Sequence, residues 1–155
     1  MIAQLAEGRP VRGGIDVGTG IEMDGELFGA SLVKAYLMES RHANYPRVAV
    51  GQDFVNYLIT STKASLTGIE GEVERTMAEG ILRWLKRDSD DQWIIDYAGQ
   101  AAPEQLPGLS EMLGPAKAFA ERSRAKYMGR QGEEGRKLFD RYSMLVRYLE
   151  RSGVR

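Results

Sequence analysis

The sequence predicts a mixed α/β (α+β) fold, in which a small mixed sheet with a β-hairpin is packed by helices. Three observations lead to this class. The chain has 155 residues, 43% of them apolar and 28% charged, which is typical of a single globular domain. An Asp-Gly pair at Asp24 separates two short runs that contain apolar residues, the usual pattern of a hairpin. Strand-like runs and helical periodicity alternate along the rest of the chain.

The first third of the chain contains four predicted elements. A strand covers residues 11–18, where apolar residues alternate with smaller ones, and the hairpin covers residues 21–28. Apolar residues then recur at helical spacing over residues 30–43. Pro46 ends that helix, because proline disfavours helical geometry in the residue before it. A short strand follows at residues 47–50.

The middle of the chain predicts two helices and one strand. Residues 52–59 form a short helix, and the Ser-, Thr- and Gly-rich residues 60–71 form a loop. Residues 72–86 form a longer helix with an apolar stripe on one face. The acidic residues 88–91 form a turn that leads into an aromatic-rich strand at residues 93–97.

The C-terminal third predicts a helical extension. Residues 99–109 contain two prolines and form a linker, and two long helices follow at 110–128 and 133–152. The last helix has an apolar stripe at positions i, i+4, i+7 and i+11: Leu138, Tyr142, Leu145 and Leu149. We therefore expect a domain over residues 1–98 and a C-terminal extension over residues 110–155 that packs on it.

Charge and composition exclude several classes of function. The 21 basic and 22 acidic residues are mixed along the chain, so we expect no basic face for nucleic acid. The absence of cysteine excludes disulfides and thiolate metal sites, and it suits the reducing cytosol. No apolar run approaches the ~20 residues that a membrane-spanning helix needs. We expect a soluble cytoplasmic protein that does not bind membranes.

Local patterns offer few candidates for a metal or phosphate site. His42 is the only histidine, which excludes multi-histidine metal sites and catalysis. The acidic turn at residues 88–91 lacks the central glycine and distal glutamate of a calcium loop, which favours a plain turn. The N-terminal glycines match neither common phosphate-loop pattern and favour the backbone geometry of a sheet. They are Gly13, Gly14, Gly18 and Gly20.

Four segments in order resemble the class III adenylate/guanylate cyclase homology domain, especially a bacterial cyclase-like subgroup. They are R-G-G-I-D-V-G at residues 12–18, the F-G-A-S-L helix start and its continuation at 28–39, P-R-V-A-V at 46–50 and the aromatic strand at 93–97, which ends in Asp-Tyr. The resemblance covers the C-terminal portion of that domain. It implies a ferredoxin-like, cyclase-type half domain, here followed by additional helices.

Departures from the family pattern imply that the chain is not catalytic alone. The family's two metal-binding aspartates belong to the N-terminal half of the domain, and the resemblance implies that the sequence starts after that half. The Asn and Arg that stabilise the family's transition state correspond to Val33 and Leu37. Cyclisation needs two metal ions and a cationic or polar group at the reacting phosphate. We therefore expect no catalytic residues and no cofactor, with Mg²⁺ or Mn²⁺ only if a partner chain supplies the aspartates.

Two carboxylates remain as weak candidates for substrate binding. The position that reads the purine edge in the family corresponds to Glu26, which the hairpin also explains as a solvated carboxylate. Asp16, in the first predicted strand, is the second candidate. Both matter most if the chain retains nucleotide chemistry.

The resemblance favours a degenerate cyclase-like domain that acts in signalling through protein association. Active sites in the family form between two subunits, so we expect a homodimer or a heteromeric partner chain. A small sheet also leaves exposed edges that invite pairing with another chain. Two alternatives stay open: a split or divergent nucleotide cyclase, a lyase completed by a partner chain, and a regulatory module that binds a nucleotide.

Overall fold

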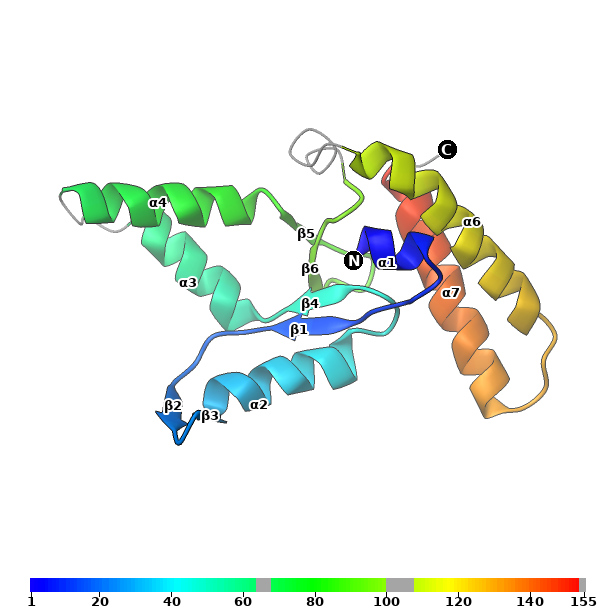
Figure 1. Cartoon of the computed structure of the whole chain (residues 1–155), viewed down its shortest axis with the longest axis horizontal. Helices are drawn as coiled ribbons and strands as arrows, with labels where there is room; N and C mark the ends of the chain where they lie inside the picture. Colours follow the sequence, from blue (N-terminus) through cyan, green and yellow to red (C-terminus); the bar gives the residue numbers. More distant parts are fainter. Residues whose placement is uncertain (64–67, 100–107, 154–155) are drawn as a thin grey trace. The chain divides into compact units, whose positions relative to one another are not determined.

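The computed structural model confirms the mixed α/β class, with a small mixed sheet packed by helices (Figure 1). It describes residues 1–63, 68–99 and 108–153. None of the helices within these ranges is long and apolar enough to cross a lipid bilayer.

The chain forms two compact units, each made of segments that are separate in the sequence. The sheet unit comprises Gly13–Ala43 and Val48–Ile95, and the helical unit comprises Met1–Arg12, Asn44–Arg47 and Asp96–Arg155. The expected division into residues 1–98, a linker and a C-terminal extension stays a prediction. Residues 100–107 of that linker lie outside the described ranges.

The sheet unit is built on four short strands in the order β1-β4-β6-β5. They are β1 (Gly13–Ile15), β4 (Val48–Val50), β6 (Trp93–Ile95) and β5 (Leu85–Arg87). β1 runs parallel to β4, and the other neighbours are antiparallel. The two central strands contribute buried residues to the core, namely Ala49, Val50 and Ile94.

β5 corrects the sequence interpretation, which extended a helix over residues 72–86. The helix α4 (Ile69–Leu82) ends earlier, and Leu85 pairs with Ile95 of β6. Leu85 continues the four-residue spacing of the helix, so periodicity alone could not separate the two elements. The predicted acidic turn joins β5 to β6, and the Asp88 backbone N–H donates to the Gln92 carbonyl at 2.9 Å.

The predicted loop at residues 60–71 is also corrected. α3 (Gln52–Lys63) continues four residues beyond the expected end, and α4 begins at Ile69. The hydroxyl groups that suggested a loop find partners inside the helix, because those of Thr60 and Thr62 donate to carbonyls one turn back. Such bonds let Ser and Thr remain in a helix at little cost.

The predicted hairpin is confirmed. β2 (Gly20–Met23) and β3 (Glu26–Gly29) form a separate antiparallel pair. Asp24 and Gly25 both have positive φ, at 55° and 78°, which is the requirement of the two-residue turn that Asp-Gly favours.

The helix after the hairpin is confirmed and lies against β1 in Figure 1. α2 (Ala30–Leu37) continues into a π-helical turn, η1 (Met38–His42). The approach to β1 is very close, because a Cβ on Gly14 would lie 2.1 Å from the backbone oxygen of Ala35. Only glycine fits at this position.

The helical unit contains the two predicted C-terminal helices and one helix that the sequence did not predict. α6 (Leu109–Tyr127) packs on both α7 (Glu133–Arg151) and the short N-terminal α1 (Ile2–Ala6). Five residues are too few to show helical periodicity. The helices bury nine apolar side chains: Ile2, Leu5, Leu109, Ala116, Ala120, Leu145, Val146, Tyr148 and Leu149.

A cluster of tyrosines belongs to the core of the helical unit. The Tyr148 ring lies 5.0 Å from that of Tyr97 and 6.0 Å from that of Tyr45, measured between ring centroids. The Tyr148 hydroxyl donates to Asp96 Oδ1 at 2.9 Å and accepts from the Ala98 N–H at 3.0 Å. Burial raises the pKa of Tyr148.

Candidate protein-association surfaces

The hairpin and the helix after it expose seven large apolar side chains, which we call the hairpin–helix surface. Each is at least 47% exposed, and Ile21 reaches 67%. The set is Ile21, Met23, Leu27, Phe28, Leu32, Val33 and Tyr36. Where exposed apolar side chains form a contiguous patch on a soluble protein, the patch usually marks an interaction site.

The four residues of this set that belong to the hairpin are exposed because two strands alone cannot enclose a hydrophobic core. Every residue of β2 and β3 is exposed. The register places Ile21 opposite Phe28, so their side chains share one face of the ribbon. Leu27 pairs with Glu22 and belongs to the other face. Apolar side chains are therefore exposed on both faces.

In the described ranges, α2 contacts β1 and the hairpin strands but keeps part of its surface exposed. Ala35 and Met38 approach Gly14 in β1. Leu32, Val33 and Tyr36 remain exposed. The sequence identified this apolar spacing as helical, but it assigned no interaction role to most of the residues in it.

The structure places Asp16 at the start of α3 instead of in an open cleft. Its Oδ1 accepts hydrogen bonds from the backbone N–H groups of Val17 at 2.9 Å and Phe54 at 3.1 Å. A Cβ on Gly51 would lie 2.2 Å from this carboxyl group. Asp16 thus serves as an acceptor for the first turn of α3, which leaves otherwise unpaired N–H groups.

Lys34 joins the same region to α2. Its Nζ donates to Asp53 Oδ2 at 2.6 Å and to the Val17 carbonyl at 3.3 Å. The hydrogen bond to Asp53, aided by the charges of Asp53 and Asp16, raises the pKa of Lys34. The Asp16 carboxylate therefore has a structural environment of backbone amides and a neighbouring cation.

Glu26 lies in β3 opposite Met23, exposed on the hairpin. Asp16 and Glu26 thus belong to different elements with different surroundings. Val33 and Leu37, the positions that correspond to the family's transition-state residues, lie one turn apart on α2. Val33 is 57% exposed and Leu37 is half-buried.

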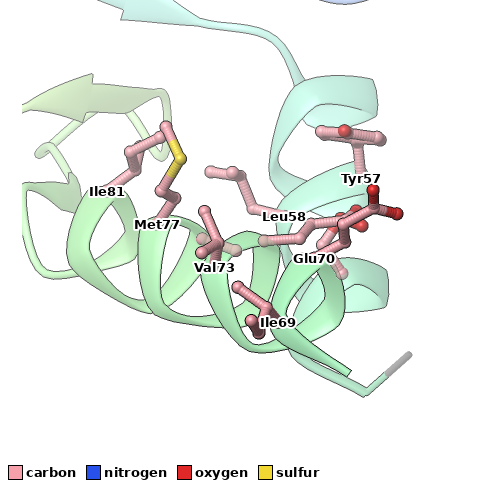
Figure 2. A pocket seen from close by; sticks show the side chains of 10 residues that line it. Tyr57, Leu58, Ile69, Glu70, Val73, Met77 and Ile81 are labelled. Carbon is pink, nitrogen blue, oxygen red and sulfur yellow. The ribbon is translucent and has the colours of Figure 1, made fainter. Parts of the chain in front are cut away.

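A second apolar surface is a groove of about 450 Å³ between α3 and α4, which we call the α3–α4 groove (Figure 2). It is lined by Tyr57, Leu58, Ser61, Ile69, Glu70, Val73, Glu74, Met77, Ala78 and Ile81. The Ser61 hydroxyl donates to Glu74 Oε1 at 2.7 Å and ties the two helices together. The helical spacing predicted an apolar stripe at Val73, Met77 and Ile81, but it placed Ile69 in a loop and could not show that the stripe lies open.

Within the described ranges, no group of three or more His, Cys, Asp or Glu side chains could hold a metal ion. Comparison with protein-family models, curated proteins and solved structures gave no match. The resemblance to class III cyclases therefore stays a prediction from the sequence.

Proposed function

We propose that this chain is a degenerate class III cyclase-like domain that works by pairing with a second copy of itself and does not catalyse cyclisation alone. The hairpin–helix surface is the observation that carries this proposal. The seven large side chains are each about half exposed or more, and together they expose several hundred Å². Leu27 lies on the other face of the hairpin, and the remaining six approach one partner's share of a standard interface.

The chemistry of the surface supports association more than catalysis. Val33 and Leu37 offer neither charge nor hydrogen bonds to a reacting phosphate. Asp16 is engaged with backbone amides. Such a domain would act in the cytoplasm, in bacterial cyclic-nucleotide signalling, as the resemblance implies.

Charge favours a reciprocal arrangement of the two copies. The hairpin carries Glu22, Asp24 and Glu26, and no basic residue lies between Gly13 and Val33. Two hairpins packed together would bring like charges into contact. If each hairpin packs on α2 of the other copy, the acidic tips stay apart and the interface is self-complementary.

Light scattering during size-exclusion chromatography tests the pairing. We expect the full chain to elute with the mass of a dimer, and Val33→Glu to shift it to the monomer, because an unpaired charge would be buried. Met128→Glu is the matched control, since Met128 is 66% exposed in the helical unit. A wild-type monomer at high concentration, or a dimer that survives Val33→Glu, would overturn the pairing.

Product analysis tests the lack of catalysis. Purified protein with Mn²⁺ and each ribonucleoside triphosphate should give no cyclic nucleotide by mass spectrometry. A product above the boiled control would favour the divergent cyclase instead. A rise in melting temperature with one nucleotide, without product, would favour the nucleotide-binding module.

A further inference from the structure

The exposed side of α4 carries a second apolar stripe, separate from the hairpin–helix surface. Among the described elements, α4 packs extensively only on α3. Ile69, Val73 and Met77 follow one another at four-residue intervals on its open side and are 83%, 51% and 62% exposed. Figure 2 shows these side chains directed into the α3–α4 groove, with Tyr57 and Leu58 on the facing helix.

The dimensions of the groove suit a helix. The stripe runs from Ile69 to Ile81, and the twelve steps between these residues extend over about 18 Å along the helix axis. A partner helix of three to four turns would cover this length with apolar residues at i, i+3 or i+4, and i+7. Met77 adds a flexible side chain that can adapt to such a partner.

The charged residues that line the groove are acidic. Both charged residues that line it, Glu70 and Glu74, are glutamates. Glu74 is held in place by Ser61. Arg75, the basic residue of α4, does not line the groove and pairs with Glu72. The rim therefore favours a ligand that carries positive charge beside an apolar face.

We infer that the α3–α4 groove binds a helical segment of another protein, whose apolar face is flanked by Lys or Arg. The acidic rim disfavours a second copy of α4, because the glutamates of the two copies would meet. It disfavours an anionic membrane surface for the same reason. This binding goes beyond the proposed pairing through the hairpin–helix surface and uses different residues.

Fluorescence anisotropy with two designed peptides tests the inference on the full chain. Both peptides have about 16 residues and the same leucine face at helical spacing, long enough to form a helix. One peptide carries lysines beside that face, and the other carries glutamates. We expect the full chain to bind the lysine peptide in preference to the glutamate peptide, with a preference that weakens at high salt.

Three variants locate the site. Met77→Asp should lower the affinity for the lysine peptide at least about tenfold, because it places an unpaired charge under the peptide. Glu70→Lys should lower it about two- to fivefold and improve binding of the glutamate peptide. Glu79→Lys makes the same charge change on α4 away from the groove lining, and it should have a smaller effect than Glu70→Lys.

Equal affinity for the two peptides, no binding of the lysine peptide, or equal effects of Glu70→Lys and Glu79→Lys would overturn the inference. Val33→Glu should leave peptide binding unchanged, so failure of the proposed pairing can be distinguished from failure of the groove. If Met77→Asp dissociates a dimer that Val33→Glu leaves intact, a second copy fills the groove and the inference is wrong.

Discussion

α7 and α4 have apolar stripes of similar helical spacing but opposite surroundings. In α7, Leu145, Val146 and Leu149 are fully buried. In α4, Ile69, Val73 and Met77 are mostly exposed. α7 packs on α6 within the helical unit. Among the elements that the structure describes, α4 packs extensively only on α3, and its stripe stays open.

The difference shows what hydrophobic periodicity can predict. An apolar stripe indicates that burial of that face of the helix would be stabilising. The stripe does not indicate whether the element that packs against it belongs to the same chain or to another. The stripe of α7 is buried within its own unit, and the proposed partner helix would cover the stripe of α4.

The largest difference in stability should appear when one side chain is truncated in the stripe of α7 and one in the stripe of α4. Leu145→Ala should lower the free energy of unfolding by about 2–5 kcal/mol, because it removes buried contacts and leaves a cavity. Met77→Ala should change it by less than about 0.5 kcal/mol. Urea denaturation followed by circular dichroism measures both. A large loss for Met77→Ala would mean that its face is covered in solution.

A pair of glycine substitutions sharpens the comparison at the backbone. Gly14→Ala should cost about 1–3 kcal/mol or more, because the new Cβ would meet the backbone of α2 and neither chain segment can move aside easily. Gly80→Ala in α4 meets nothing within 4 Å. It should stabilise the helix by about 0.5–1 kcal/mol.

Thermal unfolding of both glycine variants beside the wild type measures this contrast. A Gly14→Ala protein as stable as the wild type would mean that α2 does not lie against β1 as described. A destabilised Gly80→Ala protein would mean that something covers that side of α4.

Much of the fold was predictable because its signals are local. Asp24 and Gly25 predicted the hairpin turn, and the apolar spacing predicted α2 and α7. The errors arose where tertiary contacts decide. Leu85 continues the helical spacing of α4, but it belongs to β5 and pairs with β6. Ser61 lies in a loop-like composition, but it belongs to α3 and donates a hydrogen bond to Glu74 of α4.

The candidate site was less predictable than the fold. Asp16 and Glu26 were candidates because the resemblance pointed to carboxylates. No local pattern in the sequence indicated that Asp16 accepts a backbone hydrogen bond from the first turn of α3. The apolar residues of α2 and α4 were visible as stripes. Whether these residues are exposed depends on which other elements pack against them. A local sequence pattern does not contain that information.

The tyrosines provide a smaller contrast between covered and uncovered side chains. Tyr148→Phe should cost about 1–3 kcal/mol, because the buried Ala98 N–H loses its acceptor and Asp96 loses a donor. Tyr36→Phe, at a position 66% exposed, should change stability by less than about 0.5 kcal/mol. Equal effects in urea denaturation would contradict the described burial of Tyr148.

The smallest effect concerns pH. Burial, followed by the influence of Tyr97 and Asp96, raises the pKa of Tyr148 above its ordinary value near 10. Above about pH 10 the unfolded chain therefore releases a proton that the folded protein keeps, so stability falls as the pH rises. The contribution is fully present below pH 10 and should decrease by about 1 kcal/mol between pH 10 and 11.

Tyr148→Phe lacks the ionisable hydroxyl of Tyr148, so the stability of this variant should depend less steeply on pH than that of the wild type. Parallel slopes for the two proteins in urea denaturation would show that Tyr148 ionises as readily in the folded state as in the unfolded one.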